Sequence, residues 1–241
     1  ETTTTDFEVF ALAFEGTRLN ASGDVRGAEG LFEKARRVAY ERHGVIARAL
    51  ADTFLGLFAL LWFRFDDALQ RSDASIAAAP EYGFLHVIEA NRALALLALG
   101  RIDEAAAAVE SFSPVPGGSQ WQHINLLISH AVMAHADGPE EAARSFAPRA
   151  QELAARRPQV TSDLLQAFAY IAHVRGDHER VDEITSNTYS FGGSGLWTLL
   201  VFTPLGATKE NFFDVYDAYR LEHPVAEQLG RDFEHSQRLL V

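Results

Sequence analysis

At residues 100–105 the chain reads GRIDEA, a glycine followed by polar, acidic and small residues. Phrases of the same kind lie at 23–28, 63–68, 137–142 and 176–181, and their closing small residues are 37 to 40 residues apart. Self-similarity with a period of roughly 20 to 50 residues is typical of proteins in which similar units stack on one another. The phrase therefore predicts a chain built from about five similar units.

Each copy of the phrase lies between two stretches that have the periodicity of a helix. Leu94 and Leu97, for example, precede Gly100 at helical spacing. A glycine at this place suits the left-handed residue that often ends a helix. Carboxylates stabilise the first turn of a following helix through its dipole. Acidic pairs occur at 66–67, 103–104 and 140–141. The pattern predicts helix-turn-helix units and an all-α fold.

This pattern resembles the tetratricopeptide repeat (TPR), a pair of antiparallel helices with small residues at set positions. The first copy matches that family best, with Gly16 in its first helix and Ala28 and Phe32 in its second. The fourth copy departs from the family, because His130 stands where a small residue is usual. The resemblance implies an α-solenoid of about five TPR-like helix-turn-helix repeats.

The units are longer than the period of about 34 residues that is usual for tetratricopeptide repeats. In this respect they are similar to the repeat domains of large ATP-dependent bacterial transcription regulators of the LuxR type. That likeness implies a sensor or interaction part of a transcriptional regulator. The ATP-binding and DNA-reading parts of such a regulator would lie outside this chain.

The repeat pattern ends just before a glycine-rich stretch, GGSG at 192–195. We expect residues 1–190 to form a TPR-like repeat domain. A stack of repeats exposes an apolar face at its end and needs an element that covers it. Residues 191–241 hold an apolar run, a break at Pro204 and two further helical stretches. We expect them to be a C-terminal helical cap of the same domain.

Composition narrows the function classes. The chain has 241 residues, of which 48% are apolar, and this excludes a disordered protein. A formal net charge of −12 makes direct nucleic-acid binding a poor expectation, because that affinity rests on Lys and Arg. The longest apolar run, 54–63, is shorter than the roughly 20 residues of a membrane-spanning helix. No signal sequence is recognisable, and we expect a cytoplasmic protein.

No group of residues in the sequence points to catalysis. The acidic pairs recur at one place in the unit, and helix initiation explains them. There are nine histidines but no cysteine and no HExxH motif, so a metal site is not expected. The GGSG stretch lacks the spacing of a phosphate-binding loop. We therefore expect no enzymatic activity, no metal and no cofactor.

The resemblance also implies a binding surface, because the first helix of each tetratricopeptide unit lines a concave groove. The corresponding positions in the middle three units carry no charge. Such a groove favours an apolar ligand, an amphipathic helix or a plug formed by the chain itself. The groove residues that we expect to contact a partner are Asn20, Leu50, Thr53, Leu57, Leu60, Leu94, Leu97, Leu127, Tyr170 and His173.

Three functions remain open at this point. The first is a module that binds a protein or peptide, as the interaction part of a bacterial transcriptional regulator. The second is a free-standing scaffold that assembles with its own second copy, since an apolar face also packs on an identical chain. The third is a domain that binds a small apolar ligand.

Overall fold

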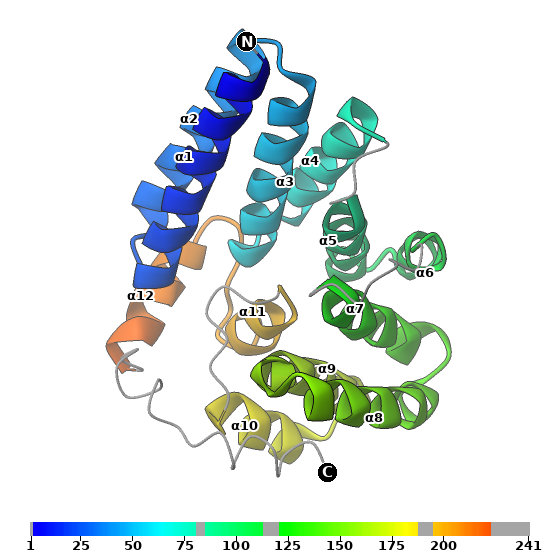
Figure 1. Cartoon of the computed structure of the whole chain (residues 1–241). Coiled ribbons are helices and arrows are strands. Elements are labelled where there is room, and N and C mark those ends of the chain that lie inside the picture. Colours follow the sequence, from blue (N-terminus) through cyan, green and yellow to red (C-terminus); the bar gives the residue numbers. More distant parts are fainter. Residues whose placement is uncertain (1, 81–84, 113–120, 188–194, 223–241) are drawn as a thin grey trace.

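The computed structural model describes residues 2–80, 85–112, 121–187 and 195–222 of the chain. Within these ranges it contains twelve α-helices, one short 3-10 helix and no strand, which confirms the all-α class (Figure 1). None of the described helices is both long and apolar enough to cross a lipid bilayer.

Ten of these helices pack as five consecutive pairs. The pairs are α1 (Thr2–Ser22) with α2 (Val25–Glu41), α3 (Val45–Leu61) with α4 (Phe65–Ala78), α5 (Leu85–Ala98) with α6 (Ile102–Glu110), α7 (Trp121–Ala136) with α8 (Pro139–Arg156), and α9 (Thr161–Arg175) with α10 (His178–Asn187). The 3-10 helix, Pro158–Val160, separates α8 from α9, and α11 (Gly195–Phe202) and α12 (Phe212–Glu222) follow.

The turns inside the five pairs fall where the recurring phrase predicts them. In all five the backbone N–H of the phrase's second residue donates to the carbonyl five positions earlier, at 2.8 to 3.2 Å. This bond is typical of a helix that ends with one left-handed residue. Gly100 supplies that residue in the third pair, with φ +72°, and Phe63 supplies it in the second, with φ +61°. A phenylalanine is rare there, and packing of the buried Phe63 ring on Phe212 holds it in place.

The small residues that close the phrase lie where two helices of a pair meet. Ala28, Ala68, Ala105 and Ala142 have no exposed surface at all. Gly16 has the same role in α1, because a Cβ atom there would lie only 2.8 Å from the Phe32 ring. Small side chains let the two backbones approach, and this is the reason for the recurring pattern.

His130, which departs from the small-residue pattern, is buried between α7 and α8. Its Nε2 atom lies 3.2 Å from Ser145 Oγ, and its Nδ1 atom lies 2.9 Å from the carbonyl oxygen of Leu126. The ring also packs against Phe146, at 5.1 Å between centroids. The fourth pair therefore accommodates a large residue by giving both ring nitrogens a partner.

Two apolar clusters make up most of the interior. The aliphatic cluster runs from α3 to α11 and is built mainly of leucine and alanine, including Leu94, Leu127 and Leu164. The aromatic cluster joins α1, α2 and α3 to α11 and α12, and its buried aromatic members are Phe32, Phe58, Trp62, Phe63, Trp197, Phe202, Phe212 and Tyr216.

The two last described helices do not simply follow the tenth. α11 lies inside the arrangement, with the five pairs around it, and contacts α3, α5, α9 and α10 (Figure 1). α12 returns to the first pair, where the Arg220 guanidinium donates to the carbonyl oxygen of Gly23 at 3.0 Å. The expected end cap at 191–241 thus includes one helix that lies in the interior. Residues 223–241 lie outside the described part.

Candidate functional site

Helix α11 packs among the helices whose residues were expected to line a groove. Leu196 and Leu200 of this helix are buried in the aliphatic cluster together with Leu60, Leu94 and Leu127. Gly195, at the start of α11, sits so close to α5 that an added Cβ would lie 2.6 Å from Leu94 Cδ2. No residue of α11 carries a charge. An uncharged helix of the same chain thus shares a buried cluster with several of the residues that were expected to contact a partner.

The ten expected groove residues are therefore divided among different environments. Five of them join the aliphatic cluster: Leu60, Leu94, Leu97, Leu127 and Tyr170. Leu50 is buried in a separate small cluster with α1 and α2. Leu57 packs half-buried on the aromatic cluster. Thr53 is directed at α4, because its hydroxyl lies 3.0 Å from Ser75 Oγ.

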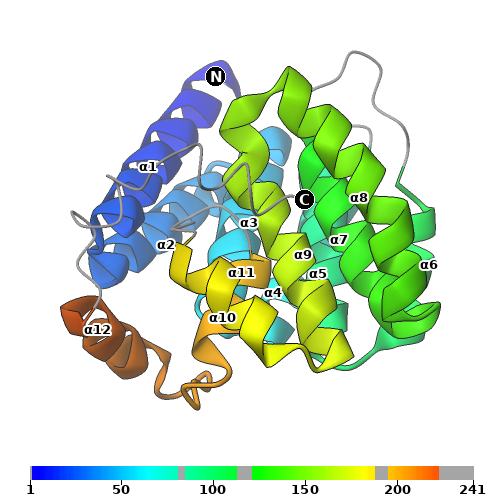
Figure 2. The ribbon, with the colours of Figure 1, turned by 90° about the horizontal axis from the view of Figure 1, so that it is seen from below.

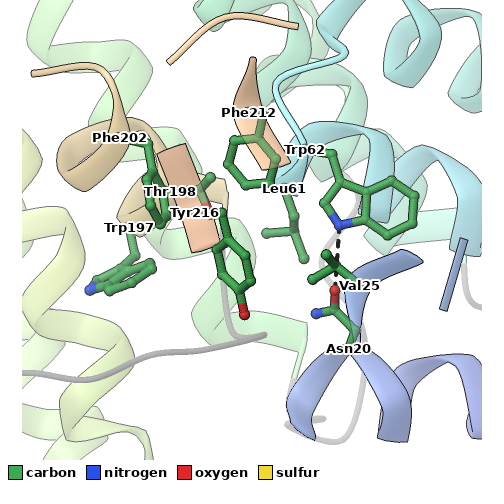
Figure 3. A pocket seen from close by; sticks show the side chains of 9 residues that line it. All are labelled: Asn20, Val25, Leu61, Trp62, Trp197, Thr198, Phe202, Phe212 and Tyr216. Carbon is green, nitrogen blue, oxygen red and sulfur yellow. Dashed lines mark hydrogen bonds between the residues drawn. The ribbon is translucent and has the colours of Figure 1, made fainter. Parts of the chain in front are cut away.

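Asn20 is buried beside a small internal cavity. Its Oδ1 atom accepts a hydrogen bond from Trp62 Nε1 at 3.4 Å (Figure 3). Trp197, Phe212 and Tyr216 are among the other residues around the cavity. Its volume is only about 20 Å³, which is enough for a single water molecule and too small for an organic ligand.

His173 alone among the ten is well exposed, and it lines a groove that is open to solvent. This groove, called here the α10–α12 groove, has a volume of about 890 Å³ and is lined by residues of α10 and α12, together with the ends of α9 and α11 and the turn after α11. Figure 2 shows where these helices lie. Its apolar part includes Leu200, Val201, Val215 and Tyr219. The groove was not expected from the sequence.

Polar side chains surround the apolar part of the α10–α12 groove. They include His173, His178, Asp182 and Glu222, all of them exposed. On α12, Val215, Ala218, Tyr219 and Glu222 follow one another at spacings of a single helix face. That stripe was visible in the sequence, but periodicity cannot tell a stripe that packs on the core from one that stays open.

A second open surface lies on α1. Phe7 and Phe14 are 72% and 59% exposed, and Phe10 between them is 40% exposed. The three rings lie three and four positions apart and so share one face of the helix. Phe10 continues inward to the half-buried Phe54 of α3, at 6.4 Å between centroids. Exposed aromatic groups of this kind mark contact surfaces more often than chance.

A buried carboxylate with polar and charged partners joins three helices. Asp52 of α3 is fully buried and accepts a hydrogen bond from the Tyr40 hydroxyl at 2.6 Å. Arg36 and Arg71 each approach its Oδ1 atom to 3.4 Å. Burial raises the pKa of Tyr40, and its hydrogen bond to Asp52 raises it further. These contacts of Asp52 join α2, α3 and α4. Because Asp52 has no exposed surface, it is not accessible to a substrate.

The histidines do not form a metal site in the described part of the chain, where no three His, Asp or Glu side chains lie close enough to share an ion. His123 lies 3.3 Å from Asp163, and His135 lies 3.2 Å from the Tyr170 hydroxyl. Burial lowers the pKa of His135, and the nearby His173 lowers it further. Burial also raises the pKa of Tyr170 to about 12. These contacts join α7 to α9.

The chain shows no match to a protein-family model, to a curated protein or to a solved structure.

Proposed function

We propose that this chain is a binding module of the tetratricopeptide type, an α-solenoid of five long repeats. It holds a peptide segment of a partner protein in the α10–α12 groove. Two regularities support the repeat assignment: the shared hydrogen bond in the turns and the buried small residue that closes the phrase. On this proposal the residues expected to line the inner groove pack on the chain's own α11. A partner therefore binds in the α10–α12 groove instead.

The α10–α12 groove is the observation that carries this proposal. Its volume of about 890 Å³ lies within the roughly 300 to 1,000 Å³ that is typical of ligand sites. It combines an apolar floor with a polar rim, as such sites usually do. It is also shared by two helices and the ends of two others, which suits an elongated segment better than a compact molecule.

A pair of substitutions on α12 tests the groove. Peptides are first selected from a displayed random library on the full chain. Ala218 lines the groove and is exposed, so Ala218→Trp fills it without disturbing the core. The neighbouring Asp217 is exposed but does not line it, and Asp217→Trp is the matched control.

Selected peptides are expected to bind the parent and Asp217→Trp equally in fluorescence anisotropy, and Ala218→Trp about tenfold or more weakly. Equal binding to all three proteins would place the site elsewhere. A library that yields no binder at all would contradict the proposed function. The melting temperatures of the two variants check that both are folded.

The likeness of the repeat length to that of LuxR-type regulators supports a place within a bacterial transcriptional regulator. On this proposal the chain is the interaction part, and an ATP-binding domain is encoded in the same gene. Sequencing through the gene on both sides of this segment tests it. A gene that encodes no such domain would contradict the regulator assignment and leave the binding module untouched.

The exposed aromatic face of α1 supports a second candidate function, a scaffold that assembles with its own second copy. Phe7, Phe10 and Phe14 would then pack on the same face of another chain. Sedimentation velocity over a range of concentrations tests this. A parent chain that sediments as a dimer, and a Phe7→Ser/Phe14→Ser variant that sediments as a monomer, would support it. A monomeric parent at all concentrations would exclude it.

A further inference from the structure

The α10–α12 groove has an unbalanced charge. Asp182 on α10 and Glu222 on α12 both line it, whereas neither Lys nor Arg is among the described residues that line it. In the part of the chain that the structure describes, neither carboxylate has a salt-bridge partner. Two negative charges therefore border an apolar floor and face solvent.

The arginines nearest in sequence to these carboxylates form hydrogen bonds or ion pairs with other groups. Arg180 donates to Glu183 Oε2 at 2.5 Å. Arg175 pairs with Glu140 on α8 at 2.8 Å. Arg220 is directed at the backbone of the first helix pair through its bond to the carbonyl of Gly23. The described lining of the groove therefore carries two carboxylates and no Lys or Arg, in a chain whose net charge is −12.

An occupant of this groove must satisfy both parts of it. Aliphatic or aromatic side chains fit on Val201, Val215 and Tyr219, which are half-buried and line the floor. An acidic segment would be repelled at Asp182 and Glu222, and a neutral one would leave both carboxylates facing an uncharged surface. A segment with Lys or Arg beside its apolar residues complements the floor and the rim together.

We propose that the partner segment of this groove is a cationic amphipathic peptide, whose apolar residues lie on the floor while its Lys or Arg side chains pair with Asp182 and Glu222. This inference rests on the proposed function, because it names the chemistry of the peptide that the groove holds. It concerns selectivity: the apolar floor supplies contact area, and the two carboxylates decide which segments are accepted.

The test uses two peptides taken from the strongest library binder. One carries Lys at the positions that flank its apolar residues, and the other carries Glu at the same positions. Both are measured at low and at high salt against the parent and an Asp182→Asn/Glu222→Gln variant. A Glu179→Gln/Asp217→Asn variant is the matched control, because it removes the same charge from exposed positions on α10 and α12 that do not line the groove.

Each exposed charge pair changes affinity by about two- to fivefold, so the Lys peptide is expected to bind the parent about tenfold more tightly than the Glu peptide. This preference should fall at high salt, vanish in Asp182→Asn/Glu222→Gln and persist in the control. Equal binding of both peptides would overturn the inference, and so would an equal loss in the control. In both cases the blocking effect of Ala218→Trp would still stand, so the proposed function would survive.

Discussion

The aliphatic and the aromatic cluster are built in different ways. The aliphatic cluster is assembled by helices that follow one another along the chain, such as α5, α7 and α9, with α11 added. The aromatic cluster brings α1, α2 and α3 together with α11 and α12, at the other end of the described chain. The aliphatic cluster therefore depends on a repeated local pattern. The aromatic cluster depends on contacts between helices that are far apart in the sequence. Four tests probe how these clusters, and the polar contacts between the helices, hold the protein together.

Phe202→Ala should have the largest effect. Phe202 of α11 is fully buried and packs on Phe212 and Tyr219, at 5.3 and 5.2 Å between ring centroids. Truncating a buried phenylalanine costs about 3 to 5 kcal/mol. The free energy of unfolding in urea measures the loss. Leu205→Ala, at an exposed position nearby, should cost less than about 0.5 kcal/mol. Similar losses would show that α11 does not close the aromatic cluster.

Asp52→Ala tests the polar link that joins α2, α3 and α4. It leaves Tyr40 without its acceptor, and two arginines lose a buried carboxylate. Because both arginines still reach water, we expect a loss of about 2 to 3 kcal/mol in urea unfolding. The exposed pair of Asp73 with Arg92, at 2.7 Å, is the control. Asp73→Ala should cost no more than about 1 kcal/mol. If Asp52→Ala lowered the free energy of unfolding by no more than Asp73→Ala, the buried contacts of Asp52 would not stabilise the fold.

Gly16 and Gly30 give a matched pair in the first helix pair. Both lie inside helices, so alanine raises helix propensity by about 0.5 to 1 kcal/mol at each. At Gly30 no atom lies within 4 Å of the new Cβ, whereas at Gly16 the buried Phe32 ring lies 2.8 Å away. Gly30→Ala should therefore raise the melting temperature. Gly16→Ala should be less stable than Gly30→Ala by about 1 to 3 kcal/mol. If both substitutions stabilised the protein equally, Gly16 would not lie in close contact with Phe32.

His130→Gln should change how stability depends on pH, and this is the smallest of the expected effects. Burial lowers the pKa of His130 below its usual 6.5. Below pH 6.5 the unfolded chain therefore binds a proton that the folded chain does not, and stability falls as the pH falls. One such group contributes at most about 1.4 kcal/mol per pH unit. Urea unfolding at pH 7.5 and 5.5 should show a smaller loss for His130→Gln than for the parent. Identical losses would mean that His130 is not buried as a neutral group.

The turns and the close helix contacts could be predicted from the sequence because they depend on neighbouring residues. A left-handed residue, an acidic first turn and a buried alanine each act within one helix pair. His130 was recognised as a departure, but the two partners that accommodate its ring were not. Those partners become visible only when α7 and α8 are placed against each other.

The candidate site was predicted only in part. The expected inner face is apolar and mostly buried, as at Leu94 and Leu127, but the sequence left open whether another molecule or the chain itself covers it. The α10–α12 groove was missed, although the stripe on α12 that lines it is regular. A stripe shows which residues share a face, and it contains no information about what that face will meet.

The sequence by itself determined the all-α class, the positions of the five turns and the small residues at the helix contacts. Each of these follows from short-range constraints on backbone conformation and helix packing. Only the tertiary structure decided that α11 packs against α3, α5 and α9 and that α12 contacts the first helix pair. The free energy gained by burying apolar surface does not depend on direction. An uncharged helix such as α11 can therefore pack on any apolar face of complementary shape. The choice among such faces depends on the position of every other helix.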